Sequence, residues 1–373
     1  LFVLFGLIGT LGLPRFYVLM AVTGLLLLVG IYDLVQHKHS ILRNYPVIGH
    51  LRYMLEFISP EIQQYFIETP QNGRPFNREQ RALIYRRAKG ISDTILDAAL
   101  GQISPIPRVI ELDRRQPEFT MTYTQYRDRV VPASRIRKGR AKFLANRALL
   151  EEIGAKIGVQ PRFIVALWGI ETDFGRVTGG FKVIPALATL AHDGRRSAYF
   201  RKELLNALRI LNEGHISPKA MVGSWAGAMG QCQFMPSSFL AHAVDYDGDG
   251  RRDIWTTRQD VFASAANYLA KSGWRADQTW GREVTLPAGF DAALADLKVQ
   301  KPIGAWQALG VRNVAGGDLP GRQLAASIVL PEKGKMSPAY MVYNNYRTTL
   351  RWNRSTYFAL AVGLLSDGIG AGG

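Results

Sequence analysis

The pattern of apolar residues divides the chain into an apolar beginning and a long region of helical patterning. Residues 1–13 are uncharged and largely apolar, and after Pro14 and Arg15 a second uncharged run covers residues 16–32. This run of 17 residues is at the short limit for a membrane-spanning helix. The basic start and small-residue cleavage site of a signal peptide are absent. We expect a membrane anchor here, with a buried soluble helix as the alternative.

From about residue 90 to the end, helical periodicity dominates. Apolar residues recur at spacings of three and four over residues 141–157, 200–211 and 261–269, which predicts amphipathic helices. Strand-like text occurs only around residues 284–286 and 324–330. The expected fold class is therefore mainly α (α+β), with a small β-containing insertion, and no internal repeat is visible.

One predicted helix differs from the others because it has no polar face. Pro161 suits the first turn of a helix, and the eight residues 163–170 that follow are FIVALWGI. A helix that is apolar all round must be buried. Glu171 comes at its end, and Gly175 can end the helix and open a cleft beside this carboxyl group.

The surroundings of Glu171 favour a role in acid catalysis. A carboxyl group among Trp168, Ile170 and Phe174 would be poorly solvated, which favours the protonated form that a general acid needs. Position alone also allows a helix-terminal glutamate in a local salt bridge. Asp173 is expected to point elsewhere and to be a solvated turn residue.

A second notable segment, residues 223–239, reads GSWAGAMGQCQFMPSSF. Its many small residues permit close approach of the backbone. Ser224 and Gln233 offer neutral hydrogen-bonding groups suited to sugar hydroxyls and acetamides. A tight helix-packing segment is an equally good interpretation of this segment by itself.

Charge and cysteine content narrow the range of partners. The formal net charge of +16 calls for a polyanion, such as nucleic acid, anionic lipid or an acidic wall polymer. The chain has no recognised RNA- or DNA-binding motif, so no nucleic-acid partner is expected. Cys232 is the single cysteine, which excludes an intrachain disulfide and leaves no Cys/His cluster for zinc.

An acidic loop predicts a calcium site. Residues 245–251 read DYDGDGR, which fits positions 1, 3, 5 and 6 of an EF-hand loop, with the Arg251 carbonyl group at position 7. Position 12 is Thr256 in place of the usual bidentate glutamate. A solvated Asp/Gly turn is the alternative.

Three motifs in order, ALWGIETDFG, GSWAGAMG and QFMPSSF, resemble the lytic murein transglycosylases of the B type, over about residues 90–367. The resemblance implies a lysozyme-like core with small α and β subdomains. It also implies cleavage of the MurNAc-β-1,4-GlcNAc bond of peptidoglycan without water, which leaves a 1,6-anhydromuramoyl end. Ordinary glycosidases use two carboxylates, but in the implied reaction the 6-hydroxyl group of the sugar can be the nucleophile, so one carboxylate suffices. A hydrolytic muramidase and a non-catalytic peptidoglycan-binding protein are the alternatives.

The resemblance also implies roles for individual residues. Glu171 matches the catalytic glutamate of the family. Arg195 and Arg196 match a pair of basic residues near the glycan and would bind lactyl or peptide carboxylates. The family usually has Tyr at the position of Trp352, so a hydroxyl group would be lost, and often Gly at that of Cys232, which puts the local backbone geometry in question. The implied substrate-binding residues are Ser224, Gln233, Phe234, Met235, Arg195, Arg196, Tyr126, Tyr268, Asn345, Tyr346 and Trp352.

The calcium loop also has a counterpart in this family, whose EF-hand-like site places its last acidic ligand further along the chain. Asp260 is the candidate for that ligand here. The ion would be structural, with no cofactor required for the chemistry. The implied metal ligands are Asp245, Asp247, Asp249, Arg251 and Asp260.

Residues 44–68 and 75–80 resemble a different family, the membrane leader of FMN-binding glutamate-synthase-like proteins. The likeness stops near residue 90, so no activity is transferred from that family. We expect a membrane anchor at residues 1–35, a connector of unknown role at 36–89 and a lytic transglycosylase catalytic region at 90–373.

The expected partners are peptidoglycan glycan strands and, through the N-terminal segment, a membrane. A wall enzyme acts on the periplasmic face, and this is the expected location. Lys38, Arg43 and Arg52 follow the anchor, however, and the positive-inside rule would keep that side in the cytoplasm.

Overall fold

The computed structural model describes residues 15–36, 42, 44–50, 90–101, 103–114, 121–332, 334–335 and 338–371. The chain forms two compact units, Leu1–Ala82 and Leu83–Gly373, which are described separately. The predicted boundaries at residues 35 and 89 stay predictions.

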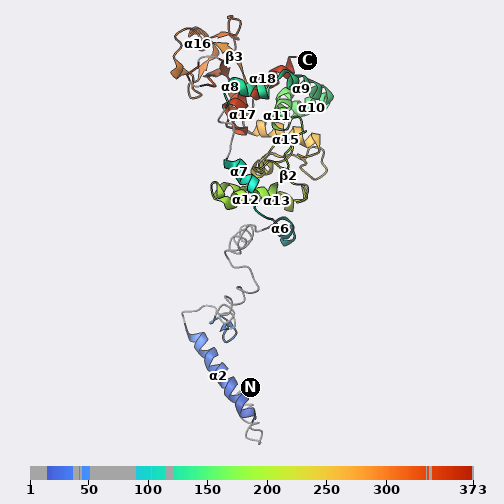
Figure 1. The fold of residues 1–373 in the computed structure, drawn as a ribbon, viewed down its shortest axis with the longest axis vertical. Coiled ribbons are helices and arrows are strands. Elements are labelled where there is room, and N and C mark those ends of the chain that lie inside the picture. The colour runs from blue at the N-terminus through green and yellow to red at the C-terminus, as the bar shows by residue number, and fades with distance from the viewer. Residues whose placement is uncertain are drawn as a thin grey trace. The chain divides into compact units, whose positions relative to one another are not determined.

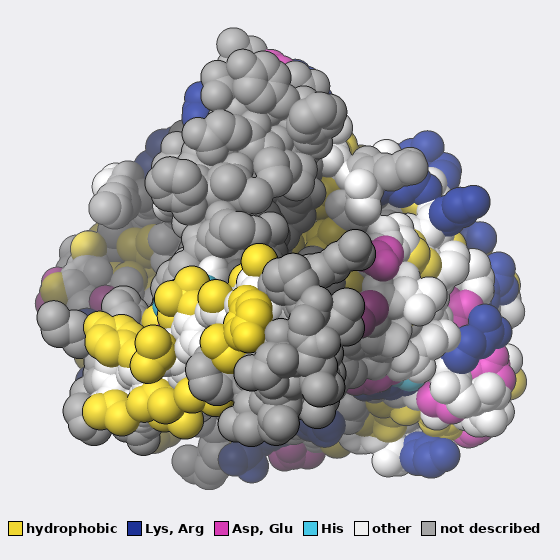
Figure 2. Space-filling model, turned by 90° about the horizontal axis from the view of Figure 1, so that it is seen from below, with side chains coloured by type: hydrophobic (Ala, Val, Ile, Leu, Met, Phe, Trp, Pro, Cys, Tyr) yellow, Lys and Arg dark blue, Asp and Glu magenta, His cyan; other side chains and the backbone are white. Residues whose placement is uncertain are grey.

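In the first unit, the predicted apolar run forms helix α2, Arg15–Val35 (Figure 1). Its segment Tyr17–Val35 is long and apolar enough to cross a membrane and is almost wholly exposed. Hydrophobic side chains gather along this helix in Figure 2. The one acidic residue of the helix, Asp33, is fully buried, and its carboxylate accepts from the backbone N–H of Val47 at 2.9 Å and lies 2.9 Å from His50 Nε2.

The described part of the second unit is mainly helical, as predicted. The 3-10 turn η2 covers Ala292–Leu294. The helices are α6 Asp93–Leu100, α7 Pro107–Arg114, α8 Tyr123–Val130, α9 Ala133–Ala145, α10 Arg147–Ile157, α11 Pro161–Thr172, α12 Val183–Asp193, α13 Ser197–Asn212, α14 Pro236–His242, α15 Arg258–Lys271, α16 Ile303–Ala308, α17 Asn344–Trp352 and α18 Thr356–Gly370. The strands are β1 Phe181–Lys182, β2 Val222–Gly223, β3 Gly281–Thr285, β4 Lys301–Pro302, β5 Arg312–Asn313, β6 Ala325–Val329 and β7 Ala339–Val342.

Two of the three helices predicted from periodicity are confirmed as parts of α13 and α15. The third, over residues 141–157, is wrong as a single helix, because α9 ends at Ala145 and α10 begins at Arg147. Asn146 separates them with φ −124° and ψ 18°, and its side chain donates to the Lys142 carbonyl group at 2.7 Å. A side-chain hydrogen bond of this kind competes with the regular helix ladder.

Helix α11 lies at the centre of this unit, in contact with α9, α10, α15 and α18. Residues 163–169 are all buried, which confirms the prediction from the missing polar face. Gly169 is required by packing: a Cβ atom there would lie 2.7 Å from the ring of Phe174, which folds back over the helix. The core thus fixes the helix that carries Glu171.

The predicted β insertion is confirmed as a five-stranded antiparallel sheet with the order β4-β6-β7-β3-β5. It lies toward one end of the unit in Figure 1, while α12 and α13 lie toward the other. The predicted strand segments fall in β3 and β6. Trp306, Ile328 and Met341 belong to the separate hydrophobic core of the sheet region.

Candidate active site

Glu171 is the penultimate residue of α11 and is half-buried. Its Oε1 accepts a hydrogen bond of 2.7 Å from Nε1 of Trp352, the last residue of α17. The Trp352 ring contacts Tyr268 at 4.7 Å and Phe234 at 5.2 Å between centroids. The structure therefore brings four predicted site residues together from segments more than 180 positions apart.

A small, mostly apolar cavity lies beside Glu171. In the part of the chain that the structure describes, Glu171 is the only acidic residue of its lining, whose other members are Ile164, Leu167, Trp168, Gln231, Cys232, Val261, Phe262, Ala265 and Trp352. Burial, with a smaller contribution from the charge of Glu171, raises the pKa of the Cys232 thiol. The cavity therefore disfavours additional negative charge.

The backbone at Cys232 is ordinary. Its φ is not among the positive values of the described residues, and its thiol donates to the Val261 carbonyl group at 3.3 Å. This position thus needs no left-handed conformation in this chain.

The end of α11 is an unusual turn in which three successive residues have positive φ: Asp173 at 50°, Phe174 at 62° and Gly175 at 80°. The helix closes at Asp173, so the prediction that Gly175 ends it is wrong by two residues. Aspartate tolerates the left-handed region better than most residues.

Asp173 is not the solvated residue that we expected. Its carboxylate bonds to Lys138 Nζ at 2.8 Å and to Arg176 Nε at 2.6 Å. Burial opposes ionisation, but the hydrogen bonds from Lys138 and Arg176 outweigh it and lower the pKa of Asp173. Asp173 thus makes a salt bridge with each of these two side chains at the end of the helix.

Gln231 holds the end of the helix in place, a role that the sequence did not indicate. Its Oε1 accepts from Trp168 Nε1 at 2.7 Å, and its Nε2 donates to the Trp255 carbonyl group at 2.8 Å. Its backbone oxygen accepts from the Thr172 hydroxyl group at 3.0 Å. The one feature of the sequence that could have indicated this role is the presence of a polar residue within a segment of small residues.

Three other predicted residues of this segment, Ser224, Gln233 and Met235, have mainly local contacts. The Ser224 hydroxyl group accepts from the Ala228 N–H at 3.0 Å and still has its own proton to donate. Gln233 has φ 50° and donates through Nε2 to the Thr178 and Gly230 carbonyl groups. Met235 is partly buried just before α14. Ser224 and Gln233 therefore shape the backbone as well as offering polar groups.

Asn345 and Tyr346 are placed differently from the prediction, because both side chains are fully buried. The Asn345 amide group bonds to the backbone of Arg275 in both directions, at 2.8 Å each, and to the Gln278 carbonyl group. Direct contact with a glycan is not available to them in this arrangement. They support α17, whose last residue reaches Glu171.

Arg195 and Arg196 converge on a buried partner. Arg195 bonds both carboxylate oxygens of Asp113, at 2.6 and 2.8 Å, and Arg196 bonds the same group. The hydrogen bond from Arg195 is the largest effect that lowers the pKa of Asp113. Tyr126 lies elsewhere and packs on Tyr357 with ring centroids 5.6 Å apart.

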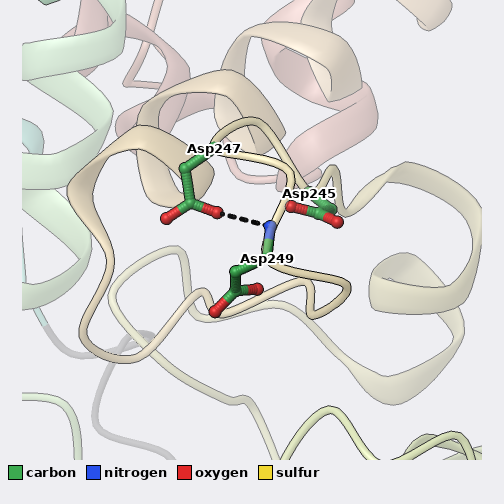
Figure 3. Close-up of side chains that lie close together, drawn as sticks. All are labelled: Asp245, Asp247 and Asp249. Carbon is green, nitrogen blue, oxygen red and sulfur yellow. Dashed lines mark hydrogen bonds between the residues drawn. The ribbon is translucent and has the colours of Figure 1, made fainter.

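The predicted calcium loop brings three carboxylates together. Ligand oxygens of Asp245, Asp247 and Asp249 lie within 4.8 Å of one another (Figure 3). The Asp249 N–H donates to Asp247 at 3.2 Å, which is the dashed line in Figure 3. The Arg251 guanidinium group also bonds to Asp249 at 2.9 Å.

The structure does not place Asp260 among these converging oxygens. Asp260 is fully buried, and its two carboxylate oxygens accept from the backbone N–H groups of Tyr246 and Asp253, each at 2.7 Å. Asp260 thus braces both ends of the acidic loop from within, where the sequence predicted a ligand.

Comparisons with known proteins agree with this arrangement. Residues 76–367 match the family described as "Transglycosylase SLT domain". Membrane-bound lytic murein transglycosylase B of Escherichia coli (strain K12) is 31% identical over 325 residues, 83% of each chain. The chain also resembles the crystal structure of SltB3 from Pseudomonas aeruginosa in complex with NAG-anhNAM-pentapeptide, with a TM-score of 0.75, 44% identity and coverage of 78% of this chain and 79% of that one.

A third similar structure is that of the Escherichia coli lytic transglycosylase SLT35 in complex with calcium. The TM-score is 0.67 and the identity 28%, with coverage of 81% of this chain and 95% of that one. The expected lysozyme-like fold class is thereby confirmed.

A separate short match concerns a different protein. A stretch of 52 residues is 50% identical to the glutamate synthase large subunit-like protein YerD of Bacillus subtilis (strain 168), and it spans 14% of this chain and 10% of that protein. This partial match agrees with the resemblance noted for the leader and transfers no activity. Because the family match spans most of the chain, the protein belongs to the transglycosylase SLT domain family and is a lytic murein transglycosylase.

Proposed function

We propose that Glu171 is the single acid/base for cleavage of the MurNAc-β-1,4-GlcNAc bond. Its carboxyl group donates a proton to the glycosidic oxygen as the bond from that oxygen to C1 of the muramic acid breaks. The carboxylate then removes the proton of the 6-hydroxyl group of the same sugar, whose oxygen bonds to C1. The product is a 1,6-anhydromuramoyl end, no water is consumed, and Glu171 regains its proton.

The observation that carries this proposal is the isolation of Glu171 as an acidic group in the described lining of its cavity. Hydrolysis by two carboxylates needs a second group about 5–10 Å away. Asp173 is a poor candidate because Lys138 and Arg176 already bind its carboxylate. The anhydro-sugar ligand named for SltB3 further supports intramolecular transfer.

We propose peptidoglycan glycan strands as the substrate, with Ser224, Gln233, Met235 and Tyr268 as polar and apolar contacts near Glu171. The support is the contact of Tyr268 with Trp352, the hydrogen bond from Gln233 to the Thr178 carbonyl group after α11, and the NAG-NAM-pentapeptide bound in SltB3, a structure 45% identical to this chain. Arg195 and Arg196 remain candidates for peptide carboxylates.

Digestion of purified sacculi by the full chain, with product masses measured, tests this function. We expect anhydro ends, lighter by one water than hydrated ends. Glu171→Gln should reduce the rate by about 10³-fold, the scale of a lost general acid, while Glu151→Gln, at an exposed glutamate of α10, should not. Hydrated ends would indicate a muramidase, and sacculus binding without turnover in any form would indicate a binding protein.

We also propose that Asp245, Asp247, Asp249 and the Arg251 carbonyl group bind Ca²⁺ in a structural role. Converging oxygens are the donors that Ca²⁺ prefers. The bound ion would neutralise the negative charge of the acidic loop. In this structure the Arg251 guanidinium group pairs with Asp249 and neutralises part of that charge. SLT35, solved in complex with calcium, supports this assignment.

Thermal unfolding with and without Ca²⁺ tests the proposed site. An ion at 100 times its Kd should stabilise the folded state by about 2.7 kcal/mol, and EDTA should remove this gain. The double variant Asp247→Asn/Asp249→Asn should lose the response, whereas Asp318→Asn, at a largely exposed aspartate, should keep it. An unchanged response in the double variant would contradict the assignment.

For location, we propose that α2 anchors the catalytic region to a membrane, with that region on the periplasmic side. The supporting observations are the exposed apolar surface of α2 and the description of the Escherichia coli relative as membrane-bound.

A further inference from the structure

The hydrogen bond between Trp352 and Glu171 joins two groups with unequal capacities. Trp352 Nε1 donates to Oε1 of Glu171 at 2.7 Å. An indole N–H can only donate, whereas a carboxyl group has two oxygens that exchange the roles of hydroxyl and carbonyl. The indole group can therefore neither take a proton from Glu171 nor accept a hydrogen bond from it.

We infer that Trp352 is a positioning residue that assigns the catalytic proton to Oε2 of Glu171. The inference rests on the proposed acid/base role of Glu171. In the protonated carboxyl group the carbonyl-type oxygen is the better acceptor, so the N–H of Trp352 favours the form in which Oε1 is the carbonyl oxygen. The hydroxyl group, and with it the proton for the glycosidic oxygen, is then on Oε2.

Such an assignment requires that the indole ring stays in place. Its ring packs between Tyr268 and the buried Phe234, with centroid distances of 4.7 and 5.2 Å. The Tyr268 hydroxyl group donates to the Arg351 carbonyl group at 2.7 Å, and the Arg351 guanidinium group donates to the Ser272 carbonyl group at 2.8 Å. These contacts tie the end of α17 to α15.

The carboxyl side of the pair is held as well. Thr172, next to Glu171, bonds the Gln231 carbonyl group, and Asp173 bonds Lys138 of α9. The backbone at Glu171 and the indole ring are therefore each held in place, which keeps the two groups within hydrogen-bonding distance.

Among the residues that the structure describes, three ionisable side chains near this pair bond to backbone oxygens. Cys232 from the neighbouring segment directs its thiol to a backbone carbonyl group, and burial raises its pKa. The Tyr268 hydroxyl group of α15 and the Arg351 side chain of α17 bond backbone oxygens. The side chains of Lys138 and Arg176 bind Asp173, two residues after Glu171.

The inference predicts two effects of losing the N–H alone. The donor that favours Oε1 as the carbonyl oxygen would be gone, so the proton would be on Oε2 less often and kcat should fall by about 10-fold, as expected for a misplaced group. The N–H also stabilises the carboxylate form, so its loss should move the basic limb of the pH–kcat profile about one pH unit higher. KM should change less than twofold, because no substrate contact is removed.

Replacement of Trp352 by 3-benzothienylalanine in the full chain is the decisive experiment, because sulfur takes the place of N–H while ring packing is kept. The matched control is the same replacement at Trp274, whose Nε1 donates to Gln160 at 2.8 Å. Rates of anhydro-end formation are measured against pH, with the analogue at position 274 expected to match wild type. Trp352→Phe should show the same upward shift of the basic limb.

A benzothienyl variant at position 352 with wild-type kcat and pH profile would overturn the inference. A tenfold loss of kcat with no shift of the limb would also overturn it, since packing alone would explain that result. Glu171→Gln distinguishes failure of the proposed function from failure of the inference about Trp352. If this variant retains activity, the proposed function is wrong. If it is inactive while the position-352 variants behave as wild type, only the role of Trp352 is wrong.

Discussion

At position 175 the backbone requires glycine for two separate reasons. Gly175 has φ 80°, and a Cβ atom there would lie 2.2 Å from Oε1 of Gln231. We predict that Gly175→Ala lowers the free energy of unfolding by about 3 kcal/mol, as left-handed strain and a displaced Gln231 combine. Urea denaturation measures this change.

Gly180→Ala is the control for this prediction. Gly180 lies in the same connection, has no neighbour within 4 Å of a Cβ atom and is outside the left-handed region. Its replacement should change the free energy of unfolding by less than about 0.5 kcal/mol. Equal effects of the two alanines would show that the Gln231 contact is not tight.

For individual residues, the sequence predicted which side chains belong to the site better than it predicted which groups they contact. Glu171 and Trp352 were both predicted to belong to the site, but their hydrogen bond joins residues 181 positions apart and no local pattern shows it. The family resemblance predicted Asn345 to be a substrate-binding residue, but its side chain is buried. Its burial depends on the backbone of Arg275 and Gln278, which only the folded chain brings near.

Among the elements, Asp113 connects α7 to the start of α13. Its buried carboxylate bonds Arg195 and Arg196, and the pKa of Asp113 is lowered chiefly by the hydrogen bond from Arg195. A lowered folded-state pKa gives stability that is present above the unfolded value near 3.8 and is lost as the pH falls through the folded-state value.

Asp113→Asn should therefore reduce the free energy of unfolding by about 2 kcal/mol at pH 7, the scale of a hydrogen bond to a charged group. The difference from wild type should narrow below pH 4. Urea unfolding at pH 7 and pH 3 measures both values. Asp128→Asn, at an exposed aspartate paired with Arg127, should have little effect at either pH. If the free energies of unfolding of wild type and Asp113→Asn differed by the same amount at both pH values, the charge of Asp113 would be excluded as the source of the stabilisation.

Helices were predicted well where their stabilising face could be read from local spacing, as in α13, α15 and the all-apolar α11. The break at Asn146 was missed because the competing bond of its side chain and the contact with Arg258, at 3.2 Å, are not periodic features. Strands β3 and β6 were indicated by composition, but the sheet order β4-β6-β7-β3-β5 depends on pairing between distant segments.

For the whole molecule, the proposed anchor is the main determinant of location. Leu25 and Leu28 are about two-thirds exposed on α2, so Leu25→Arg/Leu28→Arg should cost about 5–7 kcal/mol of membrane insertion if both lie near the bilayer centre. We predict that the full chain resists extraction from membranes at alkaline pH and that the double variant does not. Leu309→Arg/Val314→Arg, at exposed apolar residues of the second unit, should behave as wild type.

Cys232, which lines the same cavity as Glu171, is buried, and this burial has a consequence for redox chemistry. Thiol–disulfide exchange needs a thiolate that can reach another sulfur atom, and this thiol is both buried and held in its protonated form. Once folded, the chain can encounter oxidants without cross-linking to other proteins. The thiol is accessible only before α15 covers the sulfur atom during folding. Exposure to an oxidant at that stage, rather than afterwards, would trap misfolded dimers linked by a disulfide bond between two Cys232 residues.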